Sequence, residues 1–308
     1  MIKFLAPLLI VLLFPGCNNN GDHGSKKKVK QYSIAQLYKT KSIGGGYFNK
    51  DESRILVNNN ESGIYNLYEI SLSDTSMNPL SASQKESYFA VDYVAGTDKI
   101  IYKSDHGGNE TNHLYLRNPD GSTRDLTPGE KEKATFFGWN RDKSSLYYIS
   151  NRRDPKFFDL YKMDTSQWVP VMLYQNNSNF DVDAVSFNER YMVLTKTITT
   201  DKNEMYLFDR ETQTQKKIST DTDEDAVYNP QTFELNDSSF YYLTNEGKEF
   251  SYVVKYNIST GSKAKTKNTK DVPARTGFAC AKLRRSAAEQ AFGERHVRRW
   301  RSPAMTIL

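Results

Sequence analysis

Residues 136–164 decide the fold prediction, and they run FFGWNRDKSSLYYISNRRDPKFFDLYKMD. Two short runs within this stretch, 146–149 and 160–163, are rich in aromatic and branched apolar side chains. Such runs are typical of β-strands, and the segment Asn140-Arg141-Asp142 before the first run is typical of a tight turn. The stretch therefore predicts short strands joined by hairpins.

The same pattern recurs along the chain. Apolar pairs begin at Ile55, Ile100, Leu146, Tyr191 and Phe240, at intervals of 45, 46, 45 and 49 residues. A second set begins at Leu67, Leu114, Leu160, Met205 and Val253, at intervals of 47, 46, 45 and 48 residues. A period of this length with three or four strands per copy predicts an all-β fold, a β-propeller of about five recognisable four-stranded blades.

The number of copies bears on how the propeller closes. Each blade buries its faces against its neighbours, so the blades must either close a ring or leave two terminal faces uncovered. We expect an incomplete ring over residues 31–265, with a closed five-bladed ring as the alternative. No stretch in this part of the sequence has helical periodicity.

The N-terminus has the pattern of an export signal. Lys3 precedes an apolar run at 4–14, which is too short to span a bilayer as a helix. Gly16 and Cys17 follow, and a small residue before a lone cysteine resembles the bacterial lipobox. We therefore expect a signal peptide at 1–16, lipidation of Cys17, and a polar tether at 17–30. The body would then be exported and anchored to a bacterial membrane, facing the periplasm or the exterior.

Charge is concentrated in the C-terminal tail. Residues 271–308 hold eight basic and three acidic side chains, and their net charge of +5 equals that of the whole chain. The nearly neutral body offers no broad basic face, so we expect no nucleic-acid partner. The segment 266–308 is predicted to be disordered or foreign to the fold, and Cys280 within it to have no role. A genuine basic helix over 281–300, docking on a partner or a membrane surface, is the alternative.

Several segments resemble known repeats. Residues 136–143, 146–154 and 160–164 resemble the opening turn, second strand and third strand of TolB-type WD-like repeats. Residues 104–115 (SDHGGNETNHLY) and 243–250 (LTNEGKEF) resemble propeller segments of the prolyl oligopeptidase family of serine peptidases, close to dipeptidyl and acylaminoacyl peptidases. Residues 32–38 resemble the start of such a propeller.

The resemblance implies a non-catalytic propeller that restricts the access of peptides to a following α/β-hydrolase domain. That domain would carry Ser, Asp and His on a Gly-x-Ser-x-Gly elbow. No serine of this chain has glycine at both flanking positions of the elbow, and its histidines are His23, His106, His113 and His296. We therefore expect a chain truncated before the hydrolase domain, with no catalytic residue, and its own status as an enzyme stays open.

Candidate binding residues are few. If residues 107–110 form a loop, Glu110 could face the central channel and meet a peptide amine, with His106 and Asn109 beside it; a surface turn is the alternative. The acidic run 221–225 could suit calcium, but Ala226 stands where such a loop needs glycine. We therefore predict a solvated loop there, and neither a metal site nor a cofactor.

These observations lead to two functional hypotheses. The first is a secreted, lipid-anchored propeller that gates substrates for a prolyl oligopeptidase-like serine peptidase. Its partners are peptide substrates, through the missing hydrolase domain, and the membrane, through the lipid anchor. The alternative is a TolB-type propeller lipoprotein that binds a protein or glycan in the cell envelope.

Overall fold

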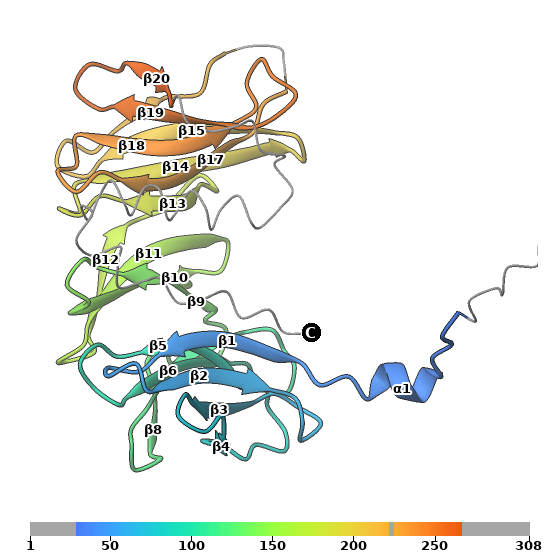
Figure 1. Cartoon of the computed structure of the whole chain (residues 1–308). Helices are drawn as coiled ribbons and strands as arrows, with labels where there is room; N and C mark the ends of the chain where they lie inside the picture. Colours follow the sequence, from blue (N-terminus) through green and yellow to red (C-terminus); the bar gives the residue numbers. More distant parts are fainter. Residues whose placement is uncertain (1–28, 222–224, 267–308) are drawn as a thin grey trace, which may run out of the picture. The chain divides into compact units, whose positions relative to one another are not determined.

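The computed structural model of the chain describes residues 29–221 and 225–266 (Figure 1). The predicted signal peptide at 1–16, the lipidation residue Cys17, the tether up to residue 28 and the tail from residue 267, with Cys280, lie outside the described residues. By their internal contacts, residues 1–40 and 41–308 form two compact units. Within the described residues, no helix is both long enough and apolar enough to cross a membrane.

The first unit contains one short helix, α1 (Ile34–Tyr38). Its start is a capping box in which the Ser33 hydroxyl accepts a hydrogen bond from the Gln36 backbone N–H at 3.2 Å, and the Gln36 side chain accepts one from the Ser33 N–H at 2.8 Å. A helix of five residues is too short for hydrophobic periodicity to reveal it.

The described residues of the second unit form five antiparallel four-stranded sheets, each made of four consecutive strands (Figure 1). We call these sheets the first to fifth blades. The first contains β1 (Ile43–Phe48), β2 (Arg54–Asn59), β3 (Asn66–Ser71) and β4 (Met77–Pro79); the second β5 (Phe89–Tyr93), β6 (Ile100–Ser104), β7 (His113–Arg117) and β8 (Thr123–Asp125); the third β9 (Ala134–Trp139), β10 (Ser145–Asp154), β11 (Phe157–Asp164) and β12 (Pro170–Tyr174); the fourth β13 (Asp181–Val185), β14 (Tyr191–Thr199), β15 (Lys202–Asp209) and β16 (Thr214–Lys217); the fifth β17 (Tyr228–Phe233), β18 (Ser239–Thr244), β19 (Tyr252–Asn257) and β20 (Lys263–Lys265). The predicted all-β propeller architecture is confirmed.

The two sets of predicted repeats fall on the second and third strands of every blade. The predicted apolar pair of the fourth blade begins one residue too early. In the fourth blade Met192 and Val193, rather than Tyr191 and Met192, pair with β13 as Ile55 and Leu56 pair with β1. Both Met192 and Val193 are fully buried, whereas Tyr191 is only partly buried, and apolarity alone does not distinguish them in the sequence.

Every first strand carries a β-bulge at the same place, so that one residue has no partner on the second strand. The bulged residues are Gly46, Val91, Phe137, Asp183 and Gln231. A bulge bends its strand and redirects a side chain, and bulges gather beside functional sites. The first strand of a propeller blade is the one nearest the central channel, so the bulges bend that layer in the same way five times.

The turns between first and second strands use polar residues in two ways. The Oδ1 atoms of Asn49 and Asn140 each accept a backbone N–H across the turn at 2.9 Å. The left-handed positions are instead held by Glu52 (φ 57°) and Lys143 (φ 58°), and in the second blade by Gly96 (φ 72°). The prediction that Asn, Asp and Gly supply the positive φ thus holds for Gly96 but not for these asparagines, which serve as hydrogen-bond acceptors.

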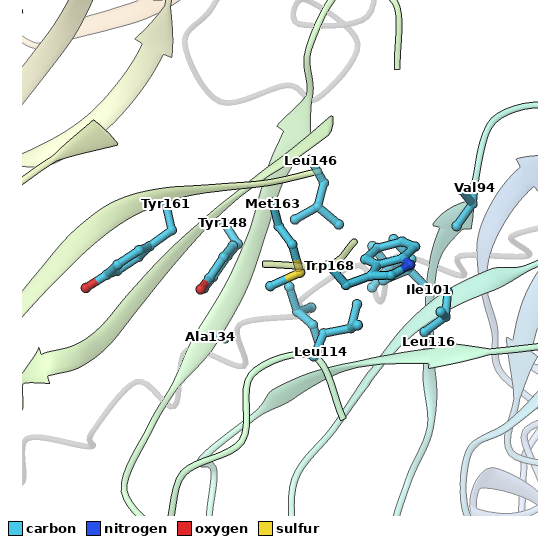
Figure 2. Packing of buried hydrophobic residues seen from close by; sticks show 12 residues of the cluster. Val94, Ile101, Leu114, Leu116, Ala134, Leu146, Tyr148, Tyr161, Met163 and Trp168 are labelled. Carbon is cyan, nitrogen blue, oxygen red and sulfur yellow. The ribbon is translucent and has the colours of Figure 1, made fainter. Parts of the chain in front are cut away.

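Buried apolar residues join consecutive blades in four clusters. Between the second and third blades, Leu146, Met163 and Trp168 contribute from one side, and Ile101 and Leu116 from the other (Figure 2). Burying a side chain of leucine size stabilises the fold by about 1.5–3 kcal/mol. The core is therefore a series of sheet-on-sheet layers rather than one central mass.

Among residues 29–221 and 225–266, no such layer covers one face of the first blade. Phe48 follows the bulge of β1 by two residues and is 44% exposed, whereas Tyr93 and Phe233 at the equivalent positions are 5% and 2% exposed. None of the four clusters combines residues of the first and fifth blades. This arrangement agrees with the expected incomplete ring.

Candidate functional site

The residues predicted to contact a ligand lie in the turn between β6 and β7. The Asn109 side chain closes this turn, because its Oδ1 accepts the backbone N–H groups of His106 at 3.3 Å and of Thr111 at 3.0 Å. The His106 side chain is 90% exposed and lies 3.6 Å from Glu86. Glu110 is exposed and has a left-handed φ of 60°. The structure thus brings the three residues into one turn, and contact with a ligand stays a prediction for them.

The topology places this turn at a defined end of its sheet. In a blade of four consecutive antiparallel strands, the hairpin between the second and third strands and the connection to the next blade leave from the same end. Segments of this kind are 105–112, 126–133 and 155–156. Any ligand that meets the loops at this end of the propeller therefore meets hairpins and inter-blade connections together.

A pocket of about 300 Å³ opens among these segments. The connection at 128–132, between the second and third blades, forms one wall, and Asn151, Arg152 and Pro155 at the end of β10 form the other. A Cβ atom on Gly129 would lie 2.8 Å from the Cβ of Glu132, so the connection can follow this path only with glycine there. Asn151 ties the walls together, since its Oδ1 accepts the Lys133 N–H at 2.6 Å.

The pocket holds one buried carboxylate and one guanidinium. The Glu132 side chain is only 5% exposed and accepts the Ser150 hydroxyl at 2.9 Å. Arg152 is 33% exposed, and its Nε lies 3.9 Å from Glu132, so the two charges attract without a close hydrogen bond. The guanidinium also lies over the ring of Tyr161, 5.7 Å from its centroid, and within 3.4 Å of the Tyr148 hydroxyl. Among the described residues, the other N–H groups of the Arg152 guanidinium have no hydrogen-bond partner.

Burial and neighbouring charges determine the protonation states of Tyr148 and Arg152. Burial raises the pKa of the Tyr148 hydroxyl to about 12, so it stays protonated near neutrality. Burial would lower the pKa of Arg152, but its hydrogen bond with Tyr148 and the charge of Glu132 outweigh this effect and raise it. The pocket therefore presents a fixed positive group beside a buried acidic one.

The neighbouring Arg153 anchors the hairpin that carries Arg152. Arg153 makes two hydrogen bonds to the fully buried Asp159, at 2.7 and 2.9 Å, and a third to the Asn176 carbonyl at 2.7 Å. A bidentate pair of this kind has a narrow geometry. It fixes the end of β10, so Arg152 is presented from a rigid strand rather than from a loose loop.

Two carboxyl groups on the first strands are also perturbed. Burial raises the pKa of Asp92, which accepts the Trp139 indole N–H of the next blade at 2.8 Å. Burial raises the pKa of Asp183, at the bulge of β13, to about 6, although the Thr195 hydroxyl donates to it at 2.7 Å. Asp92 links two blades, whereas the Asp183 hydrogen bond with Thr195 lies within the fourth blade.

The histidines do not form a nucleophilic set with a serine. His113 Nδ1 lies 2.7 Å from Asp125, and among residues 29–221 and 225–266 no hydrogen bond joins a serine hydroxyl to His106 or His113. The described part of the chain also contains no cluster of three side chains suited to a metal ion.

The sequence analysis did not single out Glu132 and Arg152, which line the pocket. In the sequence, residues 146–154 resemble a repeat strand and its turn, and Glu132 lies in a polar connection. The length of strand β10 is the feature that could have indicated the pocket. β10 contains ten residues where β6 contains five, so its polar end extends beyond the regular sheet.

Comparisons with known proteins agree with this architecture. A family model described as the prolyl oligopeptidase N-terminal β-propeller domain matches residues 71–278. The dipeptidyl aminopeptidase BIII of Pseudoxanthomonas mexicana is 31% identical over 83 residues, which make up 26% of this chain and 12% of that protein. This chain therefore spans only a small part of that relative.

Solved structures are similar at the level of the fold. A prolyl endopeptidase matches with a TM-score of 0.55 at 14% identity, over 74% of this chain and 36% of its own. Prolyl oligopeptidase B of Galerina marginata gives 0.52 at 14% identity, over 74% and 34%. An oligogalacturonate lyase in complex with manganese gives 0.52 at 16% identity, over 73% and 66%. Since the family model spans more than half of the chain, in which the blades repeat as the sequence predicts, the chain belongs to the family of prolyl oligopeptidase N-terminal β-propeller domains.

Proposed function

We propose that this chain is the non-catalytic, substrate-gating propeller of a secreted prolyl oligopeptidase-like serine peptidase. Its family membership and the named peptidase relative support this role. The observation that carries the proposal is the pocket between the second and third blades, where Glu132 and Arg152 lie within 4 Å of each other. Peptide hydrolysis itself would belong to a hydrolase domain.

The pocket suits a peptide because a peptide carries both kinds of complementary group. Its ammonium group can pair with the carboxylates of Glu130 or Glu132, and its carbonyl or carboxylate oxygens can accept from Arg152. The low exposure of Glu132 strengthens such a contact, since little water competes for it. Gating then means that short or unfolded peptides reach these groups, whereas folded proteins do not.

Calorimetric titration with short peptides tests the pocket. Arg152→Gln and Glu132→Gln are each expected to weaken binding at least about tenfold, because a charged hydrogen bond contributes about 1.5–3 kcal/mol. The matched control is Arg210→Gln, whose side chain is 40% exposed in the turn between β15 and β16, at the opposite end of the fourth blade. Equal affinities for all four proteins would remove the pocket from the mechanism.

Catalysis and partner binding are tested separately. The chain alone is expected to hydrolyse no peptide, and turnover that a serine-directed phosphonate abolishes would contradict the proposal. Specific retention of one envelope protein or glycan, by a chain lacking residues 271–308, would instead favour a TolB-type binding lipoprotein.

Export and lipid anchoring form a further part of the proposal. The apolar run at 4–14 and the lone Cys17 support it. When the chain is expressed in a bacterium, detergent phase partition should place it in the detergent phase, and Cys17→Ser should move it to the aqueous phase. A protein that partitions identically with and without the cysteine is not anchored through it.

A further inference from the structure

The third blade ends in an outer strand, β12, that differs from the outer strands of the other four blades. β12 contains five residues, whereas β4, β8, β16 and β20 contain three or four. Charged side chains occupy β8, β16 and β20, and β4 ends in Pro79. Charges, proline and short length are the usual means by which an edge strand avoids pairing with another chain. β12 has a proline only at its first residue and carries no charge, so it lacks most of this protection.

The exposed side chains of this edge are apolar. Val169, Val171 and Met172 are 56%, 58% and 39% exposed. Buried aromatic residues on either side of this run, Trp168 at 6% and Tyr174 at 7%, hold it in place. Because the edge is already ordered, this chain would lose little conformational freedom when another strand pairs with it. The third blade therefore presents a fixed apolar edge whose only partner among the described strands is β11.

The charge around this edge decides which occupant it suits. Residues 165–180 contain no Asp, Glu, Lys or Arg. On β11, Lys162 lies opposite Val171, and its ammonium is already paired with Glu189 at 2.6 Å. Two identical strands that pair antiparallel bring like residues together about a two-fold axis, so a charge near the axis is opposed by its own copy. Lys216 on β16 and Lys263 on β20 would oppose such self-pairing, whereas the residues of β12 permit it.

We propose that the outer edge of the third blade, residues 169–172, pairs antiparallel with the same edge of a second copy of this chain. The pairing continues the four-stranded sheet across the two-fold axis and covers Val171 and Met172 of each copy. A second copy is favoured over a strand of another protein, because the edge has no charge with which to select a foreign partner. Glu132 and Arg152 are not part of this edge, so dimer formation is independent of the proposed peptide binding.

Sedimentation equilibrium of the full chain measures the association. A small interface of this kind is expected to have a micromolar dissociation constant, so the parent chain should approach twice its monomer mass at about 100 µM. Val171→Lys should raise the dissociation constant at least about tenfold, because it places two ammonium groups near the axis. The control Leu72→Lys adds the same charge at a residue of the first blade that is 47% exposed, and it should associate as the parent does. A parent chain that stays monomeric at this concentration, or two variants that associate equally, overturns the proposal.

A mixture of two variants separates strand pairing from misfolding. Val171→Glu alone should dissociate as Val171→Lys does, because two carboxylates then meet at the axis. Mixed in equal amounts, the two variants should form a dimer that is tighter than either variant forms alone, since a pair of opposite charges replaces a pair of like charges. Misfolded variants would not regain association in this way. Absence of the recovery overturns the proposal.

Disulfide cross-linking tests the direction of the strands, in a chain whose Cys17 and Cys280 are changed to serine. Residues that face each other across an antiparallel pair lie about 5 Å apart, which a disulfide can span, so Val171→Cys or Met172→Cys should cross-link two copies. Val169→Cys should not, because a residue two or more positions from the axis lies more than about 10 Å from its own copy. Cross-linking at 169 that is as efficient as at 171 and 172, or none at 171 and 172, overturns the proposed antiparallel pairing.

Discussion

The half-buried carboxyl group of Asp183 provides a direct test of the first-strand layer. Burial raises its pKa from the ordinary 3.8 to about 6; the Thr195 hydrogen bond lowers it and the charge of Asp181 raises it further. Below about pH 4, both the folded and the unfolded chain keep the proton. Between about pH 4 and pH 6 only the unfolded chain releases it, so stability falls as the pH rises and then levels off.

The magnitude follows from the size of the shift. About two pKa units at 1.36 kcal/mol each give about 3 kcal/mol, and solvent around a half-buried group makes this an upper limit. Asp183→Asn removes the titration but keeps an amide oxygen for the Thr195 hydroxyl. The variant should match the parent chain at pH 4 and exceed its free energy of unfolding by about 1–3 kcal/mol at pH 7.5. Urea unfolding at a series of pH values measures this difference.

A carboxylate of opposite behaviour serves as the control. Asp120 accepts the backbone N–H of Ser122 at 2.9 Å and its hydroxyl at 2.7 Å, and these hydrogen bonds lower its pKa. Its contribution is present above the unfolded pKa and is lost as the pH falls through the lowered value. Asp120→Asn should therefore destabilise the chain at pH 7.5 and have little effect in acid. A gain for Asp183→Asn that is equal at pH 4 and pH 7.5 would refute the assignment of the penalty to a buried carboxylate.

Two further predictions concern packing and turns. Leu146 is fully buried between the second and third blades, so Leu146→Ala should lower the free energy of unfolding by about 2–5 kcal/mol. The control Leu72→Ala, at a residue that is 47% exposed, should change it by less than about 0.5 kcal/mol. Similar urea midpoints for the two variants would contradict the burial of Leu146 between these blades. Lys143 has a left-handed φ of 58°, so Lys143→Gly should raise the free energy of unfolding by about 1 kcal/mol. Gly96 also has a positive φ, so Gly96→Ala should lower the free energy of unfolding by about as much. Thermal unfolding in which both variants are less stable than the parent would contradict the left-handed backbone at Lys143.

The repeat could be predicted from the sequence because each copy contains two strands whose apolar residues are buried. Leu67, Leu114 and Leu160 lie on third strands that neighbouring sheets cover, and their exposures are 0%, 1% and 0%. Such positions tolerate only apolar residues, so their spacing survives in the sequence. Tyr191 shows the limit of this reasoning, since an aromatic residue at a strand start looks like a core residue until the register is known.

The pocket could not be predicted in the same way. Glu132 and Arg152 lie 20 positions apart and become neighbours only because a connection between blades folds back over the extended end of β10. Polar residues of either segment are equally compatible with solvent-exposed loops. The burial of Glu132, which gives the site its chemistry, is a tertiary property that composition and period do not encode.

Polar contacts between blades favour particular neighbours, whereas the apolar faces do not. Apolar sheet faces of similar composition can pack on one another in several orders, so they stabilise the stack without specifying it. Glu189, in the first turn of the fourth blade, accepts the Tyr147 hydroxyl at 2.8 Å and the Lys162 ammonium at 2.6 Å from the third. Asp237, in the first turn of the fifth, accepts the two backbone N–H groups of residues 187–188 at 2.8 Å. A different neighbour would remove these contacts, although Glu189 would keep Arg210 of its own blade at 3.8 Å. The acidic turn residues therefore add a preference for the native neighbours to the stability that the repeated core supplies.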